Sequence, residues 1–140
     1  MTEPTIEQEI QAKASSAPRV TPSDIEAEIV SEHYFTAGDG VAGHCYRNVA
    51  ALHSPQTLEL LTFCVLVLKN GFTVTGESAC ASPENFNAEI GRRIARENAV
   101  EKIWPLLGFR LRDELARPVL TEADAAADLA GTPRPDHPTA

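Results

Sequence analysis

The order of apolar and polar positions predicts a strand, a tight turn and a second strand in the middle of the chain. Residues 61–68, LTFCVLVL, are apolar at every position except Thr62. A strand of this kind is covered on both faces, lies centrally in a sheet, or forms an interface between subunits. Asn70-Gly71 is a strong hairpin signal, because both residue types tolerate positive φ. The return strand is predicted at Phe72–Glu77, where apolar and threonine positions alternate.

A long helix is predicted after this hairpin, over about Pro83–Trp104. Ser82 is the expected N-cap, since a cap residue followed by proline is a typical helix start. Pro105 is expected to end the helix near Trp104. Residues 109–115 then form a short strand or a last helix, and their composition favours helix. The predicted apolar surface of the long helix begins with the stripe Phe86, Ile90 and Ile94 and continues through Ala99, Val100, Ile103 and Trp104.

Upstream of the hairpin the pattern predicts one helix and one loop. Thr21-Pro22 is a second cap-and-proline start, and the helix is expected to run to about Tyr34. Three glycines within residues 36–43 predict a loop. The predicted fold class is therefore α+β, with a small β-hairpin or sheet at Leu61–Glu77 packed against helices. The residues that suit a further short element are Val49, Ala50 and Leu52.

Three segments with different composition divide the chain. Residues 1–19 are expected to form a flexible N-terminal arm with at most one marginal helix. Residues 20–116 are expected to form a single α+β domain. Residues 117–140 are acidic and proline-rich and predict a disordered tail, in which Thr121–Asp124 suits the start of a short helix.

The hairpin needs partners, because an isolated two-stranded hairpin is marginal in water. The chain offers few other strand candidates. Either helices cover the hairpin, or another subunit continues the sheet. We therefore expect a homo-oligomer.

Composition and charge limit the classes of function that this chain can have. At 140 residues the chain is long enough for one domain with a core. A net charge of -8 argues against a general nucleic-acid binder, which is usually basic. Between residues 92 and 112, however, six basic residues stand against two acidic ones. This stretch is either a local anion-binding face or a solvated helix face with intrahelical pairs.

Cysteine usage predicts a reduced, cytosolic protein. Cys45, Cys64 and Cys80 form no CxxC motif, and no signal peptide opens the chain. No apolar run reaches the roughly 18 residues that a membrane span needs. Cys64 lies in the apolar strand and is expected to be a small buried hydrophobe.

The junction between the return strand and the long helix, residues 76–82, is the best candidate for ligand binding. A helix start offers free N–H groups and the positive end of a dipole. Small residues at this junction let a ligand approach the backbone. The alternative is that Ser82 is only a cap and Glu77 only a surface residue. The predicted ligand-binding residues are Thr75, Glu77, Ser78, Ser82, Asn85, Arg92, Arg93 and Arg96.

Enzyme chemistry has little support in the sequence, and no catalytic residue, metal ligand or cofactor is predicted. Cys80 near a helix start suits a nucleophile, but it needs a histidine base that the sequence does not bring to it. The candidate metal ligands lack any known ligand spacing. These residues are His33, His44, Cys45 and His53.

Several stretches resemble the N-four gene-49 / Sf-six gene-66 family of small tailed-phage proteins. They are residues 61–86 (LTFCVLVLKNGFTVTGESACASPENF), 88–99 (AEIGRRIARENA), 102–105 (KIWP), 108–109 (GF) and 32–35 (EHYF). The resemblance covers most of residues 20–115. It implies a phage-encoded protein that acts in the host cytoplasm, and it brings no established activity and no catalytic residues.

Two functions follow as hypotheses, by analogy with other small phage proteins that modulate the host. The first is a counter-defence sponge, an oligomer that sequesters an anionic, nucleotide-like defence signal at residues 76–82 with help from the arginines. The second is an inhibitor that binds a host enzyme or defence protein, because an acidic protein can mimic nucleic acid. Neither hypothesis involves a membrane.

Overall fold

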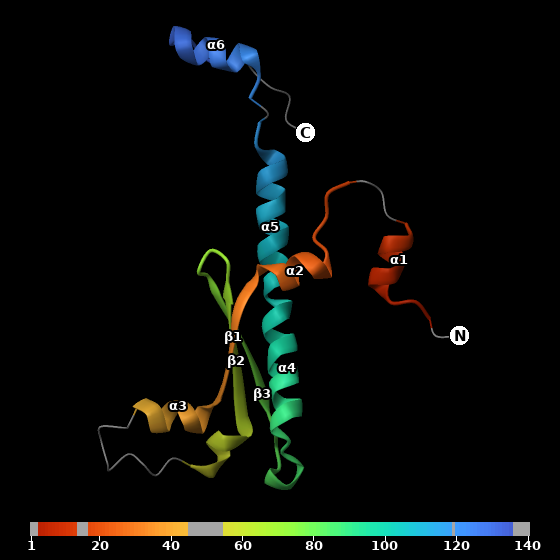
Figure 1. The fold of residues 1–140 in the computed structure, drawn as a ribbon, viewed down its shortest axis with the longest axis vertical. Helices are drawn as coiled ribbons and strands as arrows, with labels where there is room; N and C mark the ends of the chain where they lie inside the picture. The colour runs from red at the N-terminus through yellow and green to blue at the C-terminus, as the bar shows by residue number, and fades with distance from the viewer. Residues whose placement is uncertain (1–2, 14–16, 45–54, 119, 136–140) are drawn as a thin grey trace.

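The computed structural model describes residues 3–13, 17–44, 55–118 and 120–135 of the chain. Its centre is a three-stranded antiparallel sheet in the order β1-β2-β3, formed by Ile29–Thr36, Leu61–Leu68 and Thr73–Ala79. A long helix, α4 (Ala88–Glu101), packs along one face of this sheet (Figure 1). The predicted α+β class is confirmed.

The predicted hairpin is confirmed almost residue for residue. β2 occupies Leu61–Leu68 and pairs with β3 through a turn in which Gly71 has a φ of 86°. Positive φ is the conformation that glycine adopts without strain. The Asn70 side chain accepts a 2.9 Å hydrogen bond from the Phe72 backbone and closes the turn.

The helix predicted from Pro22 to about Tyr34 is wrong in its second half. Helix α2 covers Pro22–Glu28, with Thr21 as N-cap in a capping box, and the chain then enters β1. β1 pairs with β2 from Ile29 to Thr36. An apolar segment that can lie on either element becomes a strand here, because β2 offers an open edge whose N–H and C=O groups need partners. β1 supplies the third strand from within the chain.

The start of the main helix also differs from its prediction. Ser82 and Pro83 open only a short 3-10 turn, η3 (Pro83–Asn85), and the Ser82 side chain makes no capping bond. The N-cap of α4 is Asn87, whose side chain accepts a 3.1 Å bond from Ile90 N–H. Asn is as good an N-cap as Ser, and Asn87 lies five residues after the predicted start.

The buried side of α4 consists of Ala95 and Ala99, of which Ala99 belongs to the predicted apolar surface, whereas the predicted isoleucines of α4 lie outside it. Ala95 and Ala99 are fully buried, whereas Ile90 and Ile94 are 52% and 42% exposed. The reason is the close approach of helix and sheet at Gly76. A Cβ added to Gly76 would lie 2.0 Å from the carbonyl oxygen of Ala95. Only small side chains fit between two backbones at this spacing.

Pro105 does not end the helical region. α4 ends at Glu101, Lys102 intervenes, and α5 runs over Ile103–Ala116 with Pro105 in its first turn. Proline is tolerated there because its missing N–H has no intrahelical partner. Figure 1 shows α4 and α5 following one another end to end, so that α5 extends beyond the sheet. Helix was correctly favoured over strand for residues 109–115.

Shorter elements surround this unit. The glycine-rich segment predicted to be a loop is mostly α3 (Ala37–His44), and η2 (Gln56–Leu60) leads into β2. The arm contains α1 (Ile6–Ala12), and the tail contains α6 (Glu122–Ala130) with Thr121 as N-cap, as its sequence suggested. The predicted short element at residues 49–52 lies outside the described residues.

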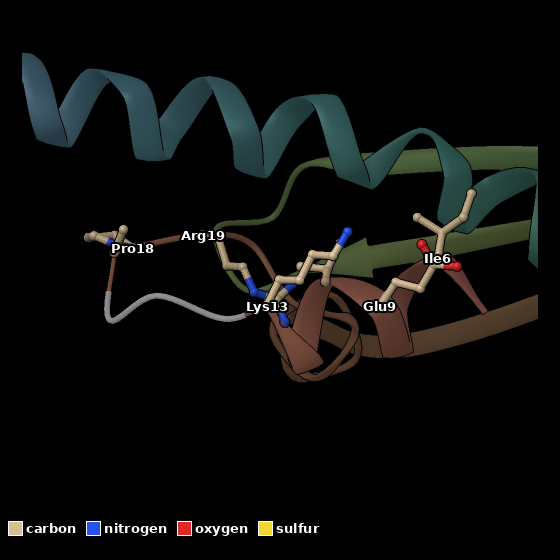
Figure 2. A pocket seen from close by; sticks show the side chains of 7 residues that line it. Ile6, Glu9, Lys13, Pro18 and Arg19 are labelled. Carbon is tan, nitrogen blue, oxygen red and sulfur yellow. The ribbon is translucent and has the colours of Figure 1, made fainter. Parts of the chain in front are cut away.

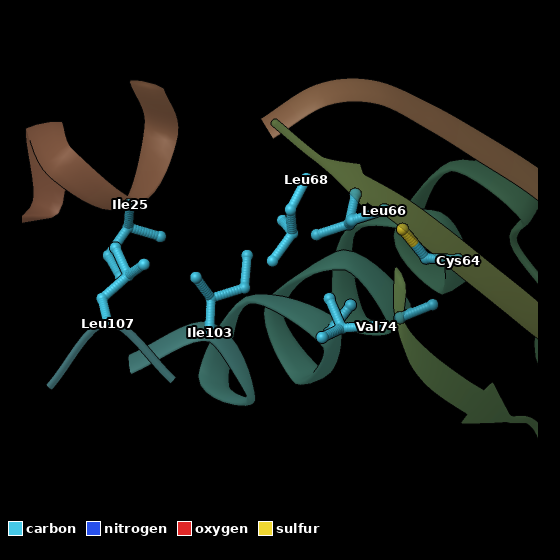
Figure 3. Packing of buried hydrophobic residues seen from close by; sticks show 9 residues of the cluster. Ile25, Cys64, Leu66, Leu68, Val74, Ile103 and Leu107 are labelled. Atoms are coloured by element: carbon cyan, nitrogen blue, oxygen red, sulfur yellow. The ribbon is translucent and has the colours of Figure 1, made fainter. Parts of the chain in front are cut away.

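The core forms a single layer between the sheet and the helices. Figure 3 shows side chains from α2, β2, β3 and α5 meeting there, with Cys64 at one end and Ile25 close to Leu107 at the other. Cys64 is completely buried, which confirms its prediction as a small core hydrophobe. The fully or nearly fully buried members are Ile25, Cys64, Leu66, Leu68, Val74, Ala95, Ala99, Ile103 and Leu107.

Candidate binding surfaces

The predicted junction contains a small cavity of about 150 Å³. It lies between the ends of β2 and β3 and the start of α4, and its lining is mainly apolar. Of the predicted site residues, Ser78 and Asn85 line it, together with Cys80. Helix and strand come close enough here that a Cβ on Gly91 would lie 3.2 Å from Thr62 Oγ1. No arginine or lysine lines the cavity, so the cavity itself offers no cation to an anionic ligand.

The remaining predicted junction residues lie apart from this cavity. The Ser82 hydroxyl donates a 2.5 Å hydrogen bond to Glu84, and the hydrogen bond from this hydroxyl keeps the pKa of Glu84 below its usual value. Thr75 and Glu77 pair with Val65 and Phe63 of β2. Because side chains alternate along a strand, they lie on the sheet face that α4 does not cover. The predicted site is therefore split between the two faces of the sheet.

The three predicted arginines are also separated. Arg92 and Arg96 are four residues apart and share one side of α4, whereas Ile90 and Ile94, beside the junction cavity, lie on the other. Arg93 points away from the sheet, because it lies at least a third of a turn around the helix axis from either buried alanine. Arg92 and Arg93 are exposed and form no ion pair within the described part of the chain.

Arg96 is already engaged by two carboxylates. Its guanidinium donates to Glu26 of α2 through two bonds of 3.1 and 2.8 Å, and its Nε donates to Glu32 of β1. The hydrogen bond to Glu26 contributes most to raising the pKa of Arg96 above its usual range, and the bond to Glu32 adds to it. The same bond from Arg96 lowers the pKa of Glu26. Arg96 thus ties α4 to α2 and β1, and its charge is balanced within the fold.

A polar pair lies beneath this cluster, against the core. Tyr34 donates a 3.4 Å hydrogen bond to Glu32, and it contacts the Cys64 thiol. Burial, then the neighbouring Cys64 and Glu32, raises the pKa of Tyr34 to about 12. Burial likewise raises the pKa of Cys64. Both groups are neutral at physiological pH, as expected for packing residues.

A second ion pair fixes α2 to α5. Glu28 is buried, with 7% of its side chain exposed, and Arg110 donates two bonds of 3.0 and 2.9 Å to it. The Arg110 hydrogen bond lowers the pKa of Glu28. A bidentate pair of this kind fixes orientation as well as charge, and it accounts for one more cation of the basic stretch.

The sheet face opposite α4 carries a row of apolar side chains. The apolar side chains that alternate with the buried ones on β2 are only partly buried, and Phe35 of β1 joins them with its ring stacked on Phe63, 5.5 Å between centroids. Among the described elements, no helix runs along this face, and α3 meets only its end, where the Gly40 position lies 3.9 Å from the Phe35 ring (Figure 1). We call this surface the open face; it consists of Phe35, Leu61, Phe63, Val65 and Val67.

The sequence predicted strand β2, but it did not predict that one face of this strand is covered and the other is open. The apolar run of β2 predicted a strand covered on both faces, central in a sheet or at a subunit interface; β2 is the central strand, and α4 covers one of its faces. The apolar residues of β2 do not indicate which face of the strand stays open. The open face is determined by where α4 packs, which depends on its close approach to β3 at Gly76.

One backbone group on each edge of the sheet is occupied by a side chain. Leu68 N–H bonds Phe72 and Cys80 N–H bonds Leu60, so the even-numbered residues of β3 face β2 and the odd-numbered ones face outward. The outward carbonyl of Glu77 accepts a 2.8 Å bond from the Asn98 side chain of α4. On the other edge, Asp39 accepts a 2.9 Å bond from Thr36 N–H. Side chains that occupy edge groups discourage the addition of another strand.

A further cavity, of about 350 Å³, lies at the N-terminal arm (Figure 2). Ile6 and Ile10 of α1 line it together with Lys13, Pro18 and Arg19. Arg19 is held by Glu7 at 2.9 Å. The cavity is formed by the arm alone, and none of its lining residues belongs to the sheet or to α4.

The candidate nucleophile Cys80 and the candidate base His33 have other hydrogen-bond partners. The Cys80 thiol donates to the Ser82 carbonyl at 3.1 Å, whereas His33 lies on the open face and contacts Ser31 Oγ. The structure therefore does not bring these two together. Within residues 3–13, 17–44, 55–118 and 120–135, no cluster of three or more His, Cys, Asp or Glu side chains suits a metal ion. The candidate ligands Cys45 and His53 lie outside the described residues.

No helix in the described ranges has the length and apolar character that crossing a membrane requires. A family model described as Phage protein (N4 Gp49/phage Sf6 gene 66) family matches residues 20–115. No curated protein and no solved structure matches the chain.

Proposed function

The chain belongs to the Phage protein (N4 Gp49/phage Sf6 gene 66) family, and on that premise we propose that it is an accessory protein that acts in the host cytoplasm by binding a host protein without catalysis. The observation that carries this proposal is the open face. Exposed apolar side chains that are contiguous on one face can mark an interaction site, whereas apolar side chains scattered singly over a surface are ordinary.

The distribution of apolar and charged side chains between the open face and the junction cavity favours a protein partner over a small anion. The open face is apolar along β2, and its aromatic pair, Phe35 and Phe63, is of the residue type enriched at protein interfaces. The junction cavity is small, mainly apolar and without a cation. Arg96 and Arg110, two of the basic residues behind the anion-binding hypothesis, are balanced by glutamates. Of the six basic residues in this stretch, Arg96 and Arg110 are therefore not free to bind an anionic ligand.

The proposal is tested by capture of the host partner with tagged full-length protein and with Val65→Lys. Lysine places a charge in the centre of the open face while its stem preserves some packing. The matched control is Phe109→Lys, which removes a 74% exposed apolar side chain from α5, away from the sheet. Circular dichroism and thermal melting establish that each variant is folded.

We expect the wild-type protein and Phe109→Lys to recover the same partner in stoichiometric amount, and Val65→Lys to lose it. Equal recovery by a folded Val65→Lys would contradict the proposal. Loss of the partner with Phe109→Lys alone would indicate that the binding surface lies on α5.

A second candidate function, sequestration of an anionic nucleotide-like ligand by an oligomer, is favoured by one observation. Arg92 and Arg93 are adjacent, exposed and without an ion pair in the described part of the chain. Calorimetry with cyclic oligonucleotides and NAD-derived nucleotides tests it, using Arg92→Ala combined with Arg93→Ala. Arg112→Ala is the control for loss of charge alone. Absence of heat with every nucleotide, or equal affinity in the double variant, would rule this function out.

A further inference from the structure

The junction cavity combines an apolar lining with a buried hydroxyl group that has no partner among the described residues. We propose that this cavity binds a small uncharged molecule that is mainly apolar and carries one oxygen able to form a hydrogen bond. The cavity lies on the face of the sheet that α4 covers. The site is therefore separate from the open face, and it goes beyond the proposed function.

Thr62 of β2 supplies the buried hydroxyl. The residue is 4% exposed, and its Oγ1 makes no hydrogen bond with any described residue. No side-chain oxygen or nitrogen among the described residues is both fully enclosed and without a partner, so this hydroxyl opens into the cavity that Thr62 lines. Burial of a hydroxyl without a partner costs free energy. A ligand that bonds to Oγ1 removes that cost.

The Thr62 hydroxyl lies toward Gly91 of α4. A Cβ added to Gly91 would lie 3.2 Å from Thr62 Oγ1, so the missing side chain leaves room beside the hydroxyl. Glycine is unfavourable in a helix interior relative to alanine, and at this position it keeps that room open. Ser78 pairs with Thr62 across the two strands, so its side chain lies on the same face and brings a second hydroxyl to the cavity.

The apolar stripe that the sequence predicts for the long helix lines the same cavity. Phe86, Ile90 and Ile94 follow one another at intervals of four residues, and all three belong to the lining. The two isoleucines are 52% and 42% exposed, so the core leaves much of their surface in contact with solvent. A molecule in the cavity would cover part of this apolar surface, which is favourable in proportion to the area covered.

Size and charge limit the class of ligand. A cavity of about 150 Å³ with an apolar lining admits a molecule of about the size of benzene. None of the described residues that line it is charged, so an ionised ligand would lose its hydration without gaining a counter-ion. A mainly apolar pocket with a few placed polar groups is typical of small-molecule sites. The class that fits is a neutral ring or short aliphatic molecule with one hydroxyl or carbonyl oxygen.

Phenol and toluene are the probes that test this inference, because they have the same size and differ only in a hydroxyl against a methyl group. Their binding to the full-length protein is followed by heteronuclear NMR of the backbone amides, with Ser78, Cys80 and Gly91 reporting on the cavity. The test variant is Thr62→Val, which removes the hydroxyl and keeps the branched shape. The matched control is Thr73→Val, the same change at an exposed position of β3 outside the cavity.

We expect saturable shifts at these amides, and phenol should bind at least about threefold more tightly than toluene to the wild type and to Thr73→Val. Thr62→Val should bind the two probes equally, and its Tm should not fall, because valine leaves no polar group without a partner. Thr62→Ser, which keeps the hydroxyl, should retain the preference for phenol.

Four results would overturn the inference. They are the lack of a saturable shift with phenol, shifts of equal size along the open face, an unchanged preference for phenol in Thr62→Val, and a marked fall in the Tm of that variant. The last result would mean that the Thr62 hydroxyl has a structural partner. Displacement of phenol by the captured host protein would also overturn it and would assign the cavity to a side chain of that protein.

Discussion

Adding one methyl group at Gly76 should destabilise this fold more than any comparable change at an exposed position. The Cβ of Gly76→Ala would lie 2.0 Å from Ala95 O, 2.3 Å from Ala99 N and 2.9 Å from the Asn98 carbonyl carbon. All three are backbone atoms of α4, so no side-chain rotation relieves the overlap. Either α4 moves away from the sheet or β3 bends.

The displacement sets the size of the effect. Reaching ordinary van der Waals contact at 3.4 Å requires a shift of about 1.4 Å, and a gap of about 1 Å already forfeits up to about half of a contact's dispersion energy. The affected contacts are those of Ala95 and Ala99, both fully buried. Overpacking typically costs about 1–3 kcal/mol, and a rigid backbone clash belongs at or above the upper end. We expect a loss of at least about 3 kcal/mol, or about 12 °C in Tm.

Urea unfolding followed by fluorescence of Trp104, the single tryptophan, measures this loss, since Trp104 packs against the core. The matched control is Gly108→Ala on α5, where an added Cβ meets nothing within 4 Å. That variant should be more stable by about 0.5–1 kcal/mol, because alanine favours helix over glycine. A loss below about 1 kcal/mol in Gly76→Ala, with an unchanged denaturant dependence, would refute the close-approach argument.

Three further predictions concern caps and titrating groups. Asn87→Ala should destabilise by about 1 kcal/mol in thermal melts while Ser82→Ala stays near neutral, because only the Asn87 side chain caps a helix; the reverse order would restore Ser82 as the functional cap. Arg110→Ala should cost about 1–3 kcal/mol at pH 7 by leaving the buried Glu28 carboxylate without its partner. The folded-state pKa of Glu28 is below its usual value of 4.5, so this stabilisation is present above pH 4.5 and is lost as pH falls through the lowered pKa; an Arg110→Ala penalty that persists unchanged below pH 3 in urea titrations would contradict the pair. The folded-state pKa of Tyr34 is raised to about 12 from 10, so the stabilisation from the neutral phenol is present below pH 10 and is lost between about pH 10 and 12. The free energy of unfolding of Tyr34→Phe should therefore fall less steeply with pH over that range than that of the wild type. Phenolate absorbance that appears at pH 10 in the folded protein would count against this prediction.

Local signals predicted the hairpin and the starts of α2 and α6. β2, the Asn70-Gly71 turn and the Thr21 and Thr121 caps depend on residues within a few positions of one another. β1 was missed because its partner is β2, about thirty residues further along the chain. Its apolar residues continue the spacing of α2, and only the open edge of β2 distinguishes strand from helix there.

The candidate site was foreseen less well than the fold. Ser78 and Asn85 do share a cavity, as their place at the junction suggested. Arg96 was assigned to ligand binding because its partners, Glu26 and Glu32, are 70 and 64 residues away in sequence. A count of charged residues in one stretch of sequence does not reveal carboxylates on other helices and strands that pair with those residues in the fold. The ligand-binding role of the eight predicted residues stays a prediction, as does the homo-oligomer.

The amino-acid sequence by itself determined which segments prefer strand or helix, where the tight turn lies and that β2 would be apolar on both sides. These follow from side-chain chemistry and backbone preferences over a few residues. Only the tertiary structure decided which face of β2 is covered. Gly76 lets α4 come so close to β3 that Ala95 and Ala99 fill the space between them, and Ile90 and Ile94 stay at the surface. Packing at that one point leaves the other face open, and the open face carries the proposed function.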